Sequence, residues 1–166
     1  MSEARYRVAL AGNPNVGKTT LFNALTGLNQ RTGNYPGVTV NWHSGDWKLP
    51  GGLVELIDLP GSYSLAARSP DEALVQKLLN GLEGPEPTAL LVIIDASNPE
   101  RNLYFLSQLM DLGLPTVVAL NMGDVAEAKG LNVDAAALSK ALGLRVVPIR
   151  ANARGGLQSL AEAVEK

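Results

Sequence analysis

Short apolar runs alternate along the chain with segments whose apolar residues recur at helical spacing. The runs are rich in Val, Ile and Leu and predict strands at 6–11, 39–47, 53–57, 89–94, 116–120 and 145–149. The helical segments lie at 19–25, from 69 onward, between 98 and 113, at 133–142 and at 157–164. This alternation is typical of an α/β domain whose sheet is mostly parallel, with helices on both faces.

Turn residues between the segments refine this prediction. The sequence Leu49-Pro50-Gly51-Gly52 joins the second and third strands, so we expect an antiparallel hairpin at one edge of a six-stranded sheet and no other antiparallel pairing. The polar, glycine-rich stretch from Leu28 to Val38 predicts a long, mobile, functional loop. Gly27 is expected to end the first helix in a left-handed conformation.

Two helix starts are marked by capping residues. Ser69-Pro70-Asp71-Glu72 combines an N-cap, a proline at the first helical position and a glutamate that completes a capping box. Asn98 before Pro99 is predicted to cap the next helix, which Gly113 ends.

Composition indicates a single domain over residues 1–166 and restricts its partners. The chain is 46% hydrophobic, and its 14 basic and 16 acidic residues give a net charge of −2 without a basic cluster, so no nucleic-acid partner is expected. It contains no cysteine, which excludes disulfides and thiolate metal sites. The apolar window 89–94 is far shorter than the roughly 20 residues of a membrane-spanning helix, and we expect this chain to be soluble.

The sequence Gly12-Asn13-Pro14-Asn15-Val16-Gly17-Lys18-Thr19 follows the first strand and opens the first helix. This is the spacing of a phosphate-binding loop, in which two glycines let the backbone curl round an anion and its N–H groups point inward. Lys18 is predicted to reach the β- and γ-phosphates, and Thr19 to bind magnesium through its hydroxyl. A Gly/Pro-rich turn without a ligand is the alternative, which the flanking strand and helix disfavour.

The sequence Asp58-Leu59-Pro60-Gly61 directly follows the strand at 53–57. Asp58 would hold magnesium through water at the carboxyl end of that strand, while the Gly61 N–H approaches the γ-phosphate. A strand-ending turn explains an isolated Asp-x-x-Gly equally well, and its position after the phosphate loop favours the functional interpretation.

The sequence Asn121-Met122-Gly123-Asp124 ends the strand at 116–120. A carboxylate there can accept both the N1–H and the exocyclic amine of guanine, so Asp124 is predicted to select guanine; a simple turn is the alternative. Arg150-Ala151-Asn152 follows the last strand and resembles a segment whose backbone N–H contacts guanine O6. Because Arg150 stands where serine is common, only the backbone contact of Ala151 is carried over.

Together these motifs resemble the GTPase domain of the FeoB-type ferrous iron transporters, which is a Ras-like G domain of the P-loop NTPase class. The resemblance covers essentially the whole chain. Besides the nucleotide motifs, it is carried by Gly33-Asn34-Tyr35-Pro36-Gly37-Val38-Thr39, by Asp58-Leu59-Pro60-Gly61-Ser62-Tyr63-Ser64-Leu65 and by Asp95-Ala96-Ser97-Asn98-Pro99-Glu100-Arg101-Asn102-Leu103-Tyr104.

The resemblance implies GTP and GDP as ligands, with magnesium and potassium as cofactors. It makes residues 28–40 the first switch and the segment after Gly61 the second. The implied catalytic residues are Lys18, Asn15, Thr39 and Gly61; the implied metal ligands are Thr19, Thr39 and Asp58 for magnesium and Asn15 for potassium. The implied nucleotide contacts are Gly12, Asn13, Pro14, Asn15, Val16, Gly17, Lys18, Thr19, Thr20, Gly37, Val38, Thr39, Asp58, Leu59, Pro60, Gly61, Asn121, Met122, Asp124, Arg150, Ala151 and Asn152.

The resemblance also implies partners within the same protein. In that family the N-terminal module is followed by a helical domain and a membrane permease domain, so this chain is expected to be a cytoplasmic domain of a cell-membrane protein. A homo-oligomer is left open.

Slow GTP hydrolysis is expected. Ras-like enzymes orient the attacking water with a glutamine directly after Asp-x-x-Gly, where this chain has the shorter Ser62. Asn15 matches the asparagine that helps to coordinate potassium in related GTPases, although asparagine also suits a tight turn.

Two other functions remain as alternatives. The first is a nucleotide-sensing module with negligible hydrolysis, which Ser62 keeps open. The second is a stand-alone Era-like ribosome-assembly GTPase, which would usually carry an RNA-binding appendage and a basic surface. His43, the tryptophans Trp42 and Trp47, and the carboxylates Asp71 and Glu72 are interpreted as structural.

Overall fold

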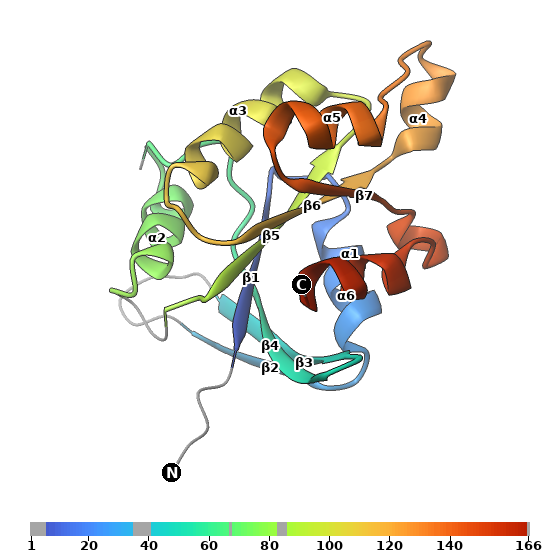
Figure 1. The fold of residues 1–166 in the computed structure, drawn as a ribbon. Helices are drawn as coiled ribbons and strands as arrows, with labels where there is room; N and C mark the ends of the chain where they lie inside the picture. The colour runs from blue at the N-terminus through green and yellow to red at the C-terminus, as the bar shows by residue number, and fades with distance from the viewer. Residues whose placement is uncertain (1–5, 35–40, 67, 83–85, 166) are drawn as a thin grey trace.

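The computed structural model describes residues 6–34, 41–66, 68–82 and 86–165. One sheet runs through the middle of the molecule, and helices cover both of its faces (Figure 1). Its strands lie in the order β2-β3-β4-β1-β5-β6-β7. Their bounds are β1 Arg7–Gly12, β2 Gln30–Asn34, β3 Asn41–Leu49, β4 Gly52–Asp58, β5 Ala89–Asp95, β6 Thr116–Asn121 and β7 Arg145–Pro148.

Alternating side chains of the central strands form two hydrophobic clusters, one on each face of the sheet. In β1, Ala9 and Ala11 belong to one cluster, while Val8 and Leu10 belong to the other. Both faces of a parallel strand are buried, so these strands contain runs of consecutive apolar residues rather than apolar residues at every second position. This explains why the uninterrupted apolar runs of the sequence predict the inner strands correctly.

Six α-helices and one short 3-10 helix lie within the described residues. Their bounds are α1 Lys18–Thr26, α2 Pro70–Leu79, α3 Pro99–Met110, α4 Gly123–Ala128, α5 Ala135–Leu142, η1 Ala151–Ala153 and α6 Leu157–Glu165. Helices α2, α3 and α5 pack against one face, and α1 and α6 against the other (Figure 1). Among the described residues, no helix has the length and apolar character needed to cross a membrane.

The fold class is confirmed, but the sheet has seven strands instead of the six expected. The additional strand, β2, occupies part of the predicted loop at 28–38; residues 35–40 lie outside the described residues. Strand β2 is antiparallel to β3, which is itself antiparallel to β4, so there are two antiparallel pairings instead of one. Strand β2 was missed because it lies at the edge of the sheet, where a strand needs no apolar face. Its Arg31 instead pairs with Asp46 of β3 at 3.0 Å.

Helix ends depart from prediction in three places. At the start of α2 the Ser69 cap is confirmed, because its Oγ accepts from the Glu72 N–H at 3.2 Å and Pro70 begins the helix. The capping box differs, because Glu72 Oε2 accepts from the Arg68 N–H at 3.0 Å and not from the Ser69 N–H. Asn98 occupies its N-cap position without a side-chain hydrogen bond. Gly27 has φ 59° and ψ −126°, a glycine conformation outside the left-handed helical region.

Helix α4 was not predicted from the sequence. It is only six residues long and starts inside the Asn121–Asp124 motif. The Asn, Gly and Asp residues of this motif favour a turn, so the sequence predicted no helix there.

Candidate nucleotide-binding site

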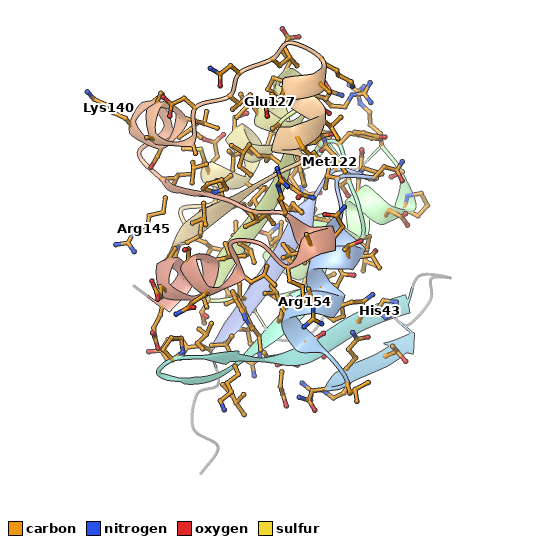
Figure 2. The ribbon with its side chains drawn as sticks, turned by 90° about the vertical axis from the view of Figure 1, so that its right-hand side faces the viewer. His43, Met122, Glu127, Lys140, Arg145 and Arg154 are labelled. Atoms are coloured by element: carbon orange, nitrogen blue, oxygen red, sulfur yellow. The ribbon has the colours of Figure 1, made fainter. Side chains whose placement is uncertain are left out.

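The predicted motifs meet at one edge of the sheet because their strands are parallel. Strands β4, β1, β5, β6 and β7 run in the same direction, so their carboxyl ends lie together. Met122 follows β6 at this edge, whereas Arg145 begins β7 at the opposite edge, and Figure 2 shows the two on opposite sides of the view.

The phosphate loop has the backbone that its glycines predict. Gly17 has φ 93°, and a Cβ there would stand 2.5 Å from Asn121 Nδ2. A Cβ on Gly12 would stand 2.7 Å from Ile93 Cγ2, so close approach requires both glycines, and the positive φ requires Gly17 as well. Asn15 has φ 65°. Helix α1 follows without an N-terminal side-chain cap, which leaves the first-turn N–H groups available to an anion.

A cavity of about 450 Å³ lies over the phosphate loop. It is lined by Asn13, Pro14, Asn15, Gly17, Lys18, Thr19, Thr20, Gly61 and Asp71. Lys18 is 9% exposed, and its Nζ forms an ion pair with Asp58 Oδ1. The site therefore combines a partly buried cation, a carboxylate and the Thr19 hydroxyl, and such hard oxygen ligands are the kind that magnesium prefers.

The Asp58–Gly61 segment packs directly on the phosphate loop. The Leu59 N–H donates to Leu10 O at 3.0 Å, and the Ser62 N–H donates to Gly12 O at 3.1 Å. A Cβ on Gly61 would stand 3.3 Å from Pro14 Cα. Ser62 itself is buried, so its hydroxyl does not face the cavity.

Asn121 connects three segments of the site. Its Nδ2 donates to Val16 O in the phosphate loop at 3.0 Å, and its Oδ1 accepts from the Ala151 N–H at 3.2 Å. Its backbone carbonyl accepts from the Ala96 N–H at 2.9 Å. The predicted Ala151 N–H donor is therefore engaged by Asn121 in this structure.

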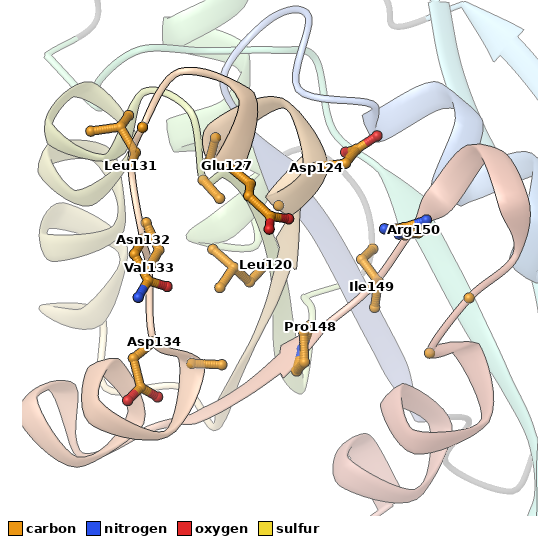
Figure 3. A pocket seen from close by; sticks show the side chains of 17 residues that line it. Leu120, Asp124, Glu127, Leu131, Asn132, Val133, Asp134, Pro148, Ile149 and Arg150 are labelled. Atoms are coloured by element: carbon orange, nitrogen blue, oxygen red, sulfur yellow. The ribbon is translucent and has the colours of Figure 1, made fainter.

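A second cavity, of about 1000 Å³, lies beside Asp124 (Figure 3). Asp124 and Arg150 stand at one side of it, Asp134 lies at the other, and Glu127 lies between them. Asp124 is exposed in the first turn of α4, and the Arg150 backbone pairs with Gly155 on both its N–H and its carbonyl.

Part of the predicted site lies outside the described residues, and the structure adds residues that were not predicted there. Gly37, Val38 and Thr39 lie outside the described residues. Asp71 was interpreted only as a helix-capping residue, yet it lines the phosphate cavity. His43 is half-buried and lies opposite Asp58 in the β3–β4 register. Strand pairing places His43, whereas helix α2 brings Asp71 to the cavity, and no local sequence signal indicates either contact.

Comparison with known proteins gives consistent matches. The family model described as ferrous iron transport protein B matches residues 6–164. A protein of Legionella pneumophila (strain Paris), described as Fe(2+) transporter FeoB, is 47% identical over 159 residues, which cover 93% of this chain and 21% of that protein. The chain thus spans about a fifth of the length of such curated relatives.

Two solved structures illustrate the likeness in three dimensions. The cytosolic domain of L. pneumophila FeoB matches with a TM-score of 0.89 and 46% identity, covering 96% of this chain and 67% of that one. A mutant of S. thermophilus NFeoB bound to GDP matches with a TM-score of 0.85 and 41% identity, covering 96% of this chain and 60% of that one.

Proposed function

The chain belongs to the ferrous iron transport protein B family, and from this premise we propose that it is the domain of a ferrous iron transporter that binds and hydrolyses GTP. The observation that carries the proposal is the double hydrogen bond of Asn121, which joins the phosphate loop to the Ala151 segment beside Asp124. This arrangement provides places for phosphates and for a base at one edge of the sheet.

Phosphate binding would draw on Lys18 and the start of α1. In this structure the Lys18 ammonium pairs with Asp58. A triphosphate offers Lys18 a more highly charged partner, which releases the Asp58 carboxylate to hold magnesium through water. Thr19 would supply one hydroxyl ligand and Thr39 a second. Magnesium, when bound, neutralises charge that develops on the β- and γ-phosphates.

Base recognition would rest on Asp124. Its carboxylate can accept both guanine donors, which adenine lacks in that arrangement. The Asp124 carboxylate is exposed in the protein alone. Bound guanine would itself cover this carboxylate, and that burial would make the site selective. To contact guanine O6, the Ala151 N–H would either donate to O6 and to Asn121 Oδ1 at once or give up its bond to Asn121.

Hydrolysis would be slow without a cation. The buried Ser62 hydroxyl cannot orient an attacking water in the cavity, and serine is shorter than the glutamine that Ras-like enzymes have at this position. Asn15 is exposed and lines the phosphate cavity, where its side-chain oxygen would help to hold potassium beside the β- and γ-phosphates.

In the whole protein, this domain would act on parts that lie beyond this chain. A helical domain and a membrane permease domain of the same protein are the proposed partners, with this domain on the cytoplasmic side. GTP binding and hydrolysis would then regulate the passage of ferrous iron through the membrane part.

The burial of Ser62 favours a second candidate, a GTP-sensing module that hardly turns over. The family match favours either of these functions over a stand-alone ribosome-assembly GTPase.

The decisive experiment measures phosphate release with GTP and with ATP, each in potassium chloride and in sodium chloride, on the chain and on Asn15→Ala. We expect GTP-selective release that potassium stimulates and that the variant loses. Tight GTP binding without phosphate release in either salt would contradict GTP hydrolysis and support the GTP-sensing module. Equal release from ATP would contradict the assignment of Asp124.

A further inference from the structure

Asn13, the second residue of the phosphate loop, has a side chain whose polar atoms are buried without partners. The residue is 2% exposed, and neither its Nδ2 nor its Oδ1 has a hydrogen-bond partner in the structure. Asn102 provides the contrast, since it is 3% exposed but fully paired. Its Nδ2 donates to Asn98 O at 2.7 Å, and its Oδ1 accepts from the Asp95 N–H at 3.1 Å. Among the described residues, Asn13 is the one amide side chain that is buried and wholly unpaired.

An unpaired amide in this position is costly, and an apolar side chain of the same shape would avoid the cost. Buried polar groups without partners therefore call for an explanation, and one explanation is a partner that arrives in another arrangement of the protein. Both amide atoms of Asn13 are closed off from solvent, so a ligand entering the cavity cannot reach them while the surrounding backbone stays in place.

The Leu59–Ser62 segment contacts the residues on either side of Asn13 in the chain. The Ser62 N–H donates to Gly12 O on one side of Asn13, and Gly61 packs on Pro14 on the other. The Ser62 hydroxyl has only a long contact, 3.4 Å, with Pro60 O. This segment is the one expected to move when the Gly61 N–H turns toward a γ-phosphate.

We propose that Asn13 is a positioning residue for the Leu59–Ser62 segment, which leads into the second switch: its amide hydrogen-bonds to the backbone of residues 59–62 when that segment closes on a γ-phosphate. In the arrangement seen here the amide is unpaired, which raises the free energy of this state relative to the closed one. The Asn13 amide group thus favours GTP over GDP without itself contacting either nucleotide. The inference rests on the proposed function, because it requires that the cavity binds GTP.

The test uses Asn13→Leu, which keeps the branched shape and removes both polar atoms, and Asn102→Leu as the matched control. Thermal unfolding without nucleotide and the affinities for magnesium-bound GDP and a non-hydrolysable GTP analogue are measured. We expect Asn13→Leu to unfold no earlier than the wild type, whereas Asn102→Leu unfolds at a lower temperature. The ratio of GTP-analogue to GDP affinity should fall about tenfold in Asn13→Leu.

An unchanged affinity ratio, or equal losses for both nucleotides, would overturn the positioning role. A wild-type chain that binds neither nucleotide would overturn the proposed function and this inference with it, so the two failures are distinguishable. If Asn13→Leu does not fold, Asn13→Ala removes the same amide with less bulk, and the same affinity ratio decides.

Discussion

Lys18 and Asp58 show how single residues of the site have two uses. Each charge is mostly buried and is neutralised by the other, which makes both tolerable in the protein alone. The same two groups are the proposed partners of phosphate and magnesium, so ligand binding exchanges one pairing for another. A charged nucleotide can therefore enter without uncovering an isolated buried charge.

Asp124 decides the base in our proposal, and its replacement tests this directly. Asp124→Asn turns one acceptor oxygen into a donor, so GTP affinity should fall about 100-fold or more and xanthosine triphosphate should bind instead. Isothermal titration with both nucleotides measures the change. Glu127→Gln is the matched control, because Glu127 lies in the same helix and lines the same cavity. GTP binding that survives in Asp124→Asn would rule out the guanine contact.

Gly17 tests the geometry of the phosphate loop. Gly17→Ala combines a positive φ of 93° with a Cβ only 2.5 Å from Asn121 Nδ2, so Asn121 must shift. We expect a loss of about 1–3 kcal/mol in the free energy of unfolding, together with loss of nucleotide binding. The measurements are denaturant unfolding and GDP titration.

Gly113→Ala is the control for Gly17→Ala. Its φ is 74° with nothing within 4 Å of the added Cβ, so it should cost about 1 kcal/mol and leave GDP binding intact. If the two variants bound GDP equally well, the close approach of residue 17 to Asn121 would not be required for nucleotide binding.

At the scale of elements, α3 holds the segment that follows Gly61. The Leu65 N–H donates to Gln108 Oε1 at 2.8 Å, and the Arg101 guanidinium lies 4.9 Å from the centre of the Tyr63 ring. Gln108 and Arg101 both belong to α3, so one rigid element positions the start of the proposed second switch.

Gln108→Leu should therefore loosen that segment. Removing the acceptor of the Leu65 N–H should raise hydrogen exchange at this amide by about tenfold, while global stability changes by about 1 kcal/mol or less. Ser107→Ala is the control, since the neighbouring Ser107 hydroxyl bonds only the carbonyl of Tyr104 in its own helix. Equal exchange at Leu65 in both variants would show that α3 does not hold the segment through Gln108.

At the scale of the whole molecule, ligand binding should appear as stability. GTP that binds the folded chain alone stabilises it by about 2.7 kcal/mol at a free concentration of 100 times the dissociation constant. Differential scanning calorimetry with magnesium and GTP should therefore show a higher unfolding temperature, and ATP at the same concentration should leave it unchanged. A rise of equal size with ATP would mean that only the phosphates are recognised.

Much of the molecule could be predicted because its signals are local. The phosphate loop is a contiguous stretch between one strand and one helix, and its glycine spacing dictates its backbone. The inner strands are apolar on both faces, which marks them as parallel and buried. Strand β2 escaped prediction because its polar residues Gln30–Asn34 carry no alternation, and its ladder to β3 places it at the edge.

The sequence by itself thus determined the α/β class and the edge of the sheet where the motifs meet, and it supplied the chemistry proposed for each motif, because residues next to one another in the chain encode these features. Only the tertiary structure decided which groups are paired. Asn121 bonds Val16, 105 positions away, Lys18 pairs with Asp58, and the Asn13 amide is left without a partner. Such pairings depend on how distant segments pack, and packing is a property of the folded chain as a whole.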